Sequence, residues 1–173
     1  DKHGMPHPNL ICEWGRYIVA PAQLTIFKVI DTKVINKKKN DAKKWYIIDG
    51  SFMNDLADTW AIDQKWAIAP INNKGDDKLT DVWLAGSTCD SDDVYRGVDN
   101  YVTLPDYTSE DSNEPMYIVV FDTGAYQDAL AMNHCLISHP MRIIAENGHI
   151  VVARKRSTPE EIGKSLGWNG GGK

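Results

Sequence analysis

A β-hairpin is the element that this sequence defines most sharply, and it constrains the fold first. The segment MRIIAENGHIVVARKR (141–156) places two runs rich in β-branched residues on either side of Asn147-Gly148. This dipeptide favours a two-residue hairpin turn because both of its residues tolerate a positive φ angle. The segment therefore predicts two antiparallel strands joined by a tight turn.

Most of the remaining sequence also has the pattern of strands. The run PMYIVVFD (115–122) is strongly apolar, which is typical of a strand buried on both faces. The segment SFMNDLADTWAI (51–62) predicts a helical turn, and residues 35–44 predict a polar loop rich in lysine. Further strands are predicted at 45–49, 64–71 and 81–86, together with one long or bent strand over 16–35 that is interrupted near Pro21.

The end of the chain changes from strand to helix. In STPEEIGKSLGW (157–168), Thr158 can cap a helix, Pro159 suits its first position and Glu161 completes a capping box. Gly167 is expected to end this helix after about two turns. Together these patterns predict a mainly β (α+β) domain of about six to eight strands with a short C-terminal helix.

Composition excludes several classes of protein. The 173 residues suffice for one domain with a substantial core, and the net charge of -5 argues against a nucleic-acid partner. No apolar run approaches the roughly 18 residues of a membrane span, so no membrane partner is expected. Cys12, Cys89 and Cys135 are odd in number and widely spaced. A disulfide framework is therefore not expected, and a reducing cytoplasm is the predicted location.

The segment GSTCDSDDVYRG (86–97) concentrates negative charge beside a cysteine. Asp90, Asp92 and Asp93 follow Cys89 within a few positions. Acids this close repel one another, so the segment is either a turn with surplus charge or a site that meets a cationic group. Taken alone, Cys89 is more typical of a packed core thiol.

Neither of two possible metal motifs is complete. The adjacent His134 and Cys135 lack the spacing of a zinc site. The run that starts at Asp90 begins like a calcium loop, but Val94 occupies its fifth position and no glycine follows. The sequence therefore predicts no metal-ligating residues.

Five motifs follow one another along the chain, and together they carry a family resemblance. They are PHP…EWGR (6–16), DTWAIDQ (58–64), TCDSDD (88–93), DTGAYQ (122–127) and HCLISHP (134–140). The chain resembles the C-terminal part of the pyridoxal-phosphate-dependent biosynthetic arginine decarboxylases, over nearly its whole length. These belong to the fold-type III group with ornithine and diaminopimelate decarboxylases and alanine racemase. DTWAIDQ and TCDSDD are the motifs that point to the arginine enzymes within this group.

The resemblance implies a domain organisation. Residues 21–168 would form the C-terminal β-sandwich or Greek-key barrel domain, 1–20 the tail of an N-terminal α/β barrel, and 169–173 a frayed tail. In this family the barrel supplies the lysine that forms the Schiff base, a glycine-rich phosphate loop and most of the substrate pocket. Only twelve residues precede Glu13, so the barrel is expected to be missing and this chain alone is not expected to decarboxylate a substrate.

The resemblance also implies which residues contact the cofactor, pyridoxal 5'-phosphate. Glu13 matches a carboxylate that faces the pyridine nitrogen, where a negative charge keeps that nitrogen protonated. Gly15 and Arg16 follow in the same motif, and Arg16 matches a guanidinium that binds the phosphate through its fork of donors. Tyr126 matches a tyrosine near that phosphate. A magnesium ion is a further cofactor of some family members.

The Cys-Asp pair of this family crosses a dimer interface into the partner's active site. By resemblance, Cys89 would deliver a proton to the product, and Asp90 would bind the cationic end of the substrate. The implied reaction converts L-arginine to agmatine and CO2 in polyamine biosynthesis. The implied assembly is a homodimer or higher homo-oligomer formed through the Cys89 loop, with a small-molecule substrate.

Two departures from the family pattern leave other functions open. Trp14 stands where the family has a small residue, and PAQ (21–23) replaces a His-His pair. One alternative is a non-catalytic module that dimerises or binds another protein. The other is a related decarboxylase that acts on ornithine or a carboxylated polyamine.

Overall fold

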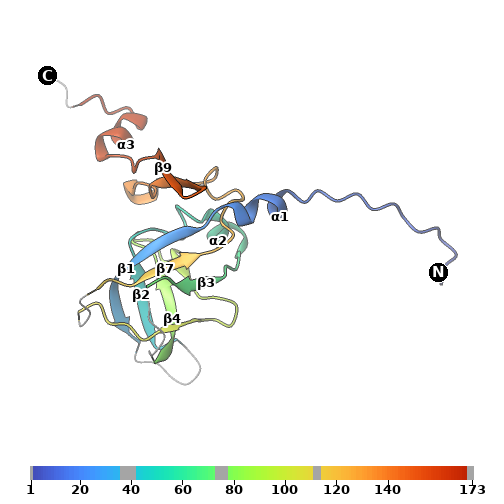
Figure 1. The fold of residues 1–173 in the computed structure, drawn as a ribbon, viewed down its shortest axis with the longest axis horizontal. Coiled ribbons are helices and arrows are strands. Elements are labelled where there is room, and N and C mark those ends of the chain that lie inside the picture. Colours follow the sequence, from blue (N-terminus) through green and yellow to red (C-terminus); the bar gives the residue numbers. More distant parts are fainter. Residues whose placement is uncertain (1, 36–41, 73–77, 111–113, 171–173) are drawn as a thin grey trace.

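The computed structural model describes residues 2–35, 42–72, 78–110 and 114–170. Strands make up most of the regular structure and curl into a nearly closed, barrel-like sheet (Figure 1). The expected mainly β fold is confirmed. Most of the lysine-rich loop expected at 35–44 lies outside the described residues.

Among the described residues, seven strands form the main sheet, in the order β3-β7-β1-β2-β4-β5, with β6 paired to β4. They are β1 (Thr25–Val34), β2 (Lys44–Ile48), β3 (Ile68–Pro70), β4 (Leu79–Ala85), β5 (Val94–Tyr95), β6 (Val102–Pro105) and β7 (Tyr117–Val120). β2 and β4 run parallel, and the other pairs are antiparallel. β5 and β6 lie along the same edge of β4, and β6 also lies near β3, which brings the sheet close to closure.

Side chains on the inner face of the sheet form one hydrophobic core. On β1, Phe27 and Val29 are buried, whereas Ile26 and Ile30 on the opposite face are about half exposed. This alternation is the period expected of a strand with one buried face. On β7, all three residues of 118–120 are buried, which confirms the prediction of a strand covered on both faces.

Tyr46 is the largest fully buried side chain of the core. Its hydroxyl donates a hydrogen bond to the carbonyl oxygen of Pro105 at 2.7 Å and accepts one from the backbone N–H of Tyr107 at 2.7 Å. These bonds join β2 to the end of β6. Burial raises the pKa of Tyr46 to about 12, because the phenolate would lose its hydration.

The prediction of one long strand over 16–35 is wrong for its first part. Residues Gly15–Val19 form helix α1, and Ala20–Ala22 form the 3-10 helix η1. A strand needs a neighbour for its backbone hydrogen bonds, whereas a helix satisfies most of its own. Pro21 lies within η1, where the sequence predicted an interruption.

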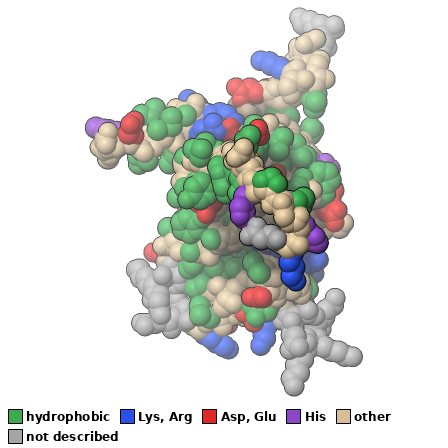
Figure 2. Space-filling model, turned by 90° about the vertical axis from the view of Figure 1, so that its right-hand side faces the viewer, with side chains coloured by type: hydrophobic (Ala, Val, Ile, Leu, Met, Phe, Trp, Pro, Cys, Tyr) green, Lys and Arg blue, Asp and Glu red, His purple; other side chains and the backbone are tan. Residues whose placement is uncertain are grey.

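The N-terminal segment and α1 expose several large hydrophobic side chains, namely Leu10, Ile11, Trp14, Tyr17 and Ile18. Figure 2 views the molecule from the side on which this segment extends, and hydrophobic side chains cover much of that face. A contiguous apolar surface of this kind is typical of a contact surface.

Two further helices agree with the sequence. Helix α2 (Ala57–Ile62) confirms the helical turn expected within 51–62, and α3 (Pro159–Ser165) confirms the C-terminal helix. The Thr158 hydroxyl accepts from the backbone N–H of Glu161 at 3.2 Å, and the Thr158 N–H donates to the Glu161 carboxylate at 2.8 Å, so the capping box is present. In the described part of the chain, no helix is both long enough and apolar enough to cross a membrane.

The predicted hairpin is confirmed and forms a small sheet of its own. It consists of β8 (Arg142–Glu146) and β9 (His149–Arg154). The turn residues Asn147 and Gly148 have φ angles of 49° and 79°, as a type I′ turn requires. The hairpin leaves many apolar side chains about half exposed or more, including Ile143, Ile144, Ile150, Val151 and Val152.

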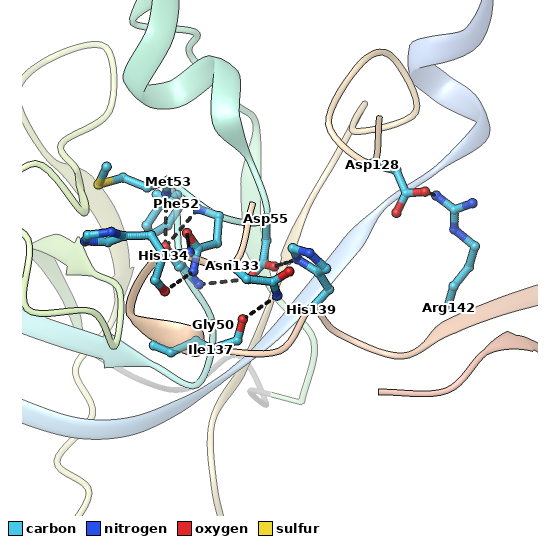
Figure 3. Close-up of polar contacts among 12 residues, drawn as sticks. Gly50, Phe52, Met53, Asp55, Asp128, Asn133, His134, Ile137, His139 and Arg142 are labelled. Carbon is cyan, nitrogen blue, oxygen red and sulfur yellow. Dashed lines mark hydrogen bonds and ion pairs between the residues drawn. The ribbon is translucent and has the colours of Figure 1, made fainter. Parts of the chain in front are cut away.

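An ion-pair cluster attaches this hairpin to the segment that follows β7. Asp128 pairs with Arg142 of β8 through one carboxylate oxygen (Figure 3). Its other oxygen accepts from Arg154 at the end of β9 at 2.9 Å. One carboxylate thus holds both strands of the hairpin.

The stability of the chain should fall at high pH because of Tyr46. Below pH 10 the phenol is neutral in the folded and the unfolded chain. Between pH 10 and about 12 only the unfolded chain loses the proton, so the free energy of unfolding should fall by up to about 1.4 kcal/mol per pH unit. Urea denaturation across this range measures the slope.

The Tyr46→Phe variant should show a shallower slope over the same range, since it has no phenol to ionise. Tyr117→Phe is the matched control, because it removes a phenol that is 36% exposed and retains Tyr46, so the slope that Tyr46 causes should remain. Equal slopes in the parent chain and Tyr46→Phe would show that Tyr46 ionisation does not govern alkaline unfolding.

Candidate active site

The 3-10 helix η1, which continues α1, is held together with the residue after it against the segment 122–127 by two backbone hydrogen bonds. The N–H of Gly124 donates to the carbonyl oxygen of Ala20 at 3.0 Å, and the N–H of Thr123 donates to that of Gln23 at 3.0 Å. A Cβ atom at Gly124 would lie 2.1 Å from the carbonyl oxygen of Val19. Glycine at this position therefore allows the close approach that places α1.

This approach brings together three of the residues predicted to contact a cofactor. The Arg16 guanidinium carbon lies 4.8 Å from the centre of the Tyr126 ring, in the geometry of a cation–π contact. A Cβ atom at Gly15 would lie 3.6 Å from the Tyr126 hydroxyl oxygen. Tyr126 itself is about half exposed and has a φ angle of 67°, so its backbone is held in the left-handed region.

Two buried residues that the sequence did not single out position Arg16. The Asp58 carboxylate of α2 pairs with Arg16 at 2.6 Å and also accepts from the Gln127 side-chain amide at 2.7 Å. The Gln127 side-chain oxygen accepts from the backbone N–H of Asp58 at 3.1 Å. Asp58 and Gln127 are 5% and 1% exposed. Their only signal in the sequence was membership of DTWAIDQ and DTGAYQ.

The other half of the guanidinium remains available. The Nη1 atom of Arg16 is buried and finds no hydrogen-bond partner among the described residues. A buried donor without a partner costs free energy, which an anionic acceptor such as a phosphate oxygen would recover. The residues around Arg16 therefore fit a phosphorylated ligand such as pyridoxal phosphate.

Glu13 is not brought into this cluster. It lies in the extended segment before α1, and its side chain is exposed. The structure thus joins Gly15, Arg16 and Tyr126, whereas Glu13 precedes α1 in the N-terminal segment, which extends away from the domain (Figure 1).

The second predicted set lies on the loop after β4. Cys89 is exposed, as expected for a residue that projects from its own domain. Asp90 is partly exposed, and its carboxylate accepts from the backbone N–H of Asp92 at 2.9 Å. The imidazole Nε2 of His134 lies 3.7 Å from the other Asp90 oxygen. Asp90 thus carries a carboxylate that a turn and an imidazole hold in place.

Cys89 has an unexpected neighbour. Its sulfur lies 3.5 Å from that of Cys135, which is also exposed. The hydrogen bond to Cys135 raises the pKa of the Cys89 thiol. The sequence placed His134 and Cys135 in a motif without a role, and the structure brings both to the Cys89 loop.

Asp93 does not belong to the charged surface of this loop, contrary to the interpretation that grouped it with Asp90 and Asp92. It is 2% exposed, and its carboxylate accepts from four donors. These are the backbone N–H groups of Phe52, Met53 and Thr88, at 2.7, 3.3 and 3.2 Å, and the Thr88 hydroxyl at 2.7 Å. A buried carboxylate with this many donors is satisfied and serves the fold.

Comparison with known proteins assigns the chain to a family. The model of the C-terminal sheet domain of pyridoxal-dependent decarboxylases matches residues 26–124. This match covers more than half of the chain, which belongs to this family.

Relatives carry more than one enzyme name. The chain is 28% identical over 163 residues to a diaminopimelate decarboxylase of Synechocystis sp., which covers 94% of this chain and 32% of the relative. It is 32% identical over 123 residues to a biosynthetic arginine decarboxylase of Bacteroides thetaiotaomicron, which covers 68% of this chain and 18% of the relative.

A solved structure is similar over nearly the whole chain. The diaminopimelate decarboxylase of M. jannaschii in complex with L-lysine superposes with a TM-score of 0.73 at 27% identity, covering 95% of this chain and 34% of that chain. The chain spans about a third of the length of the diaminopimelate decarboxylases that it matches.

Loss of the buried Asp93 carboxylate should destabilise the domain. Asp93→Ala removes the acceptor of three backbone N–H groups and one hydroxyl, so the free energy of unfolding should fall by about 3 kcal/mol. Asp92→Ala is the matched control, because Asp92 is exposed and its removal should cost less than about 0.5 kcal/mol. Urea denaturation of both variants tests this, and equal losses would contradict it.

Proposed function

We propose that the chain is the C-terminal β-domain, residues 21–168, of an arginine decarboxylase that converts L-arginine to agmatine and CO2 in polyamine biosynthesis. Membership of the pyridoxal-dependent decarboxylases supports the reaction type. The observation that carries the proposal is the Cys89-Asp90 pair, of which Cys89 is exposed and Asp90 partly exposed, on a loop that Thr88 attaches to the buried Asp93 by two hydrogen bonds. Residues 1–20 are then the end of an N-terminal α/β barrel, and 169–173 are a tail.

Arg16, Tyr126, Gly15 and Glu13 are the proposed cofactor contacts. Pyridoxal phosphate, when bound, withdraws electrons from the substrate carbon that loses CO2. Arg16 binds the phosphate through Nη1 while Asp58 holds the other side of its guanidinium. Tyr126 lies beside Arg16, and Gly15 leaves room for its hydroxyl. Glu13 keeps the pyridine nitrogen protonated by its negative charge.

Cys89 and Asp90 are proposed to act in the active site of a partner subunit. Both lie on the loop after β4, where Cys89 is exposed and Asp90 partly exposed, so they are accessible to a second subunit. The Cys89 thiol donates a proton to the carbon that has lost CO2. The Asp90 carboxylate binds the guanidinium of the substrate in a two-point contact. A homodimer or higher homo-oligomer formed through this loop completes two such sites.

Diaminopimelate is the second candidate substrate, because the relatives that cover most of the chain are diaminopimelate decarboxylases. The charge on the loop favours arginine. Asp90 and Asp92 both present carboxylates there. These suit a substrate whose side chain ends in a purely cationic group, as that of arginine does. The far end of diaminopimelate also carries a carboxylate, which would be repelled by them.

The proposal places the enzyme in the cytoplasm, and magnesium enters it only through the resemblance to the family. Cytoplasmic location follows from the three widely spaced cysteines. Within the described ranges, no group of three or more His, Cys, Asp or Glu side chains could hold a metal ion.

Substrate choice tests the proposal in the enzyme reassembled by joining this chain to an N-terminal barrel. Arginine should be decarboxylated in preference to diaminopimelate and ornithine. Asp90→Ala should weaken arginine binding by about 2 to 5 kcal/mol, because it removes one partner of a desolvated charge pair. Asp99→Ala is the control and should change KM little, because it removes an exposed carboxylate outside this loop. Turnover of diaminopimelate alone would select the second candidate.

Mixed dimers test whether the sites are shared. Cys89→Ala and Asp90→Ala lie on the same subunit, so mixing these two inactive variants should restore little activity. Mixing either variant with one that lacks the lysine of the barrel should restore one intact site per mixed dimer. Failure of this second rescue, with mixed dimers shown to form, would rule out a site shared between subunits.

A further inference from the structure

Two exposed thiols from distant parts of the chain meet at the Cys89 loop. Cys89 follows β4, and Cys135 lies in the short 3-10 helix η2 (His134–Leu136). Their sulfurs are 3.5 Å apart, which is the distance of a hydrogen bond between thiols. A disulfide bond joins two sulfurs at about 2 Å, so its formation requires these two to approach by about a further 1.5 Å.

One buried segment positions both thiols. The Asp93 carboxylate accepts from the backbone N–H groups of Phe52 and Met53, and it also fixes Thr88, next to Cys89. Asn54, which follows Met53 in the same segment, is 1% exposed and holds the loop that carries Cys135.

The contact between Asn54 and that loop is reciprocal. The side-chain amide of Asn54 donates to the carbonyl oxygen of His134 at 2.9 Å, and its oxygen accepts from the His134 N–H at 3.2 Å. His134 lies beside this segment in Figure 3. The two thiols are therefore held face to face by neighbouring residues of one buried turn.

The backbone at Cys135 is held in an unfavourable conformation. Cys135 and Leu136 both have φ angles of 57°, in the left-handed region that residues with a Cβ atom rarely adopt. Such conformations persist where surrounding contacts enforce them, and they gather at functional sites. Here the result of the strained backbone is the placement of the Cys135 sulfur against that of Cys89.

We propose that Cys89 and Cys135 are a disulfide-forming pair whose reversible oxidation withdraws the Cys89 thiol. The bond itself rests on the geometry alone. Its effect on activity rests on the proposed function, in which Cys89 donates a proton. In the oxidised pair neither sulfur carries a proton, so Cys89 cannot protonate the product.

The oxidant is a low-molecular-weight disulfide such as oxidised glutathione. Either thiol can attack first, because either sulfur can be the donor in the hydrogen bond between them. The attack forms a mixed disulfide and releases one small thiol. The other cysteine then attacks the protein sulfur of this mixed disulfide and displaces the second small thiol. Two electrons pass to the small disulfide, and the two protein protons leave on the two small thiols.

The remaining cysteine provides an internal control. Cys12 is exposed and lies in the extended N-terminal segment before α1. It should react with oxidised glutathione only to a mixed disulfide. Cys89 and Cys135 should be oxidised at a concentration at least about tenfold lower, since the second step is intramolecular and follows at once.

The bond can be measured on the 173-residue chain itself. The chain is equilibrated with mixtures of reduced and oxidised glutathione, quenched with N-ethylmaleimide and analysed by intact mass and peptide mapping. We expect a species in which only Cys12 is alkylated and Cys89 is linked to Cys135, and dithiothreitol should reverse it. Cys135→Ser should leave Cys89 alkylated under the same mixtures, whereas Cys12→Ser should keep the bond.

Other products would overturn the proposal. The glutathione mixtures in which Cys12 carries glutathione are decisive. If both Cys89 and Cys135 are still alkylated in those mixtures, the pair is no more easily oxidised than an isolated cysteine. Bonds between two copies of the chain would show that Cys89 pairs across molecules.

Measuring turnover together with bond formation tests the disulfide bond and the catalytic role of Cys89 separately. In the reassembled enzyme, oxidation should reduce turnover at least about tenfold, and reduction should restore it. Cys135→Ser should keep its own starting activity under the same oxidant. A bond that forms without loss of turnover would refute the catalytic role of Cys89, whereas absence of the bond would refute only the disulfide pair.

Discussion

The buried carboxylate of Asp93 is the interaction on which the Cys89 loop depends. Its four donors come from two segments that lie far apart in the sequence, the turn at 51–54 and Thr88. A Cβ atom at Gly86 would lie 2.1 Å from an Asp93 oxygen, so glycine is needed where β4 ends. An exposed loop is ordinarily free to move. This one is attached to the core at its base, and its reactive residues therefore have a fixed place.

A second buried carboxylate, that of Asp58, fixes Arg16 in a similar way. Asp58 is buried, and a buried carboxylate requires a cation or several donors. Arg16 supplies the cation and the Gln127 side-chain amide supplies a further donor. The Arg16 guanidinium is thereby fixed, while its Nη1 atom keeps no partner among the described residues. An arginine fixed in this way can receive a phosphate without losing further side-chain freedom, which lowers the entropic cost of binding.

Local sequence signals predicted local structure well, and long-range contacts escaped them. The turn at Asn147-Gly148 and the capping box at Thr158 were predictable because each depends on residues only a few positions apart. Helix α1 was missed because its β-branched residues are typical of a strand. The segment forms a helix because no neighbouring strand pairs with it, which the local sequence does not reveal. The burial of Asp93 could not be predicted, since its donors at 51–54 are brought to it by the sheet.

The candidate site shows the same division. Motifs indicated Arg16, Tyr126 and Cys89 by their resemblance to a family, but the residues that position them became visible only in three dimensions. Both sets open outward: Tyr126 is about half exposed, and Cys89 is exposed on its loop. A substrate bound at either set would be covered on one side only. On the proposed function, a decarboxylation site gains from the exclusion of water, and the exposed hydrophobic side chains around α1 offer a surface that further protein could cover.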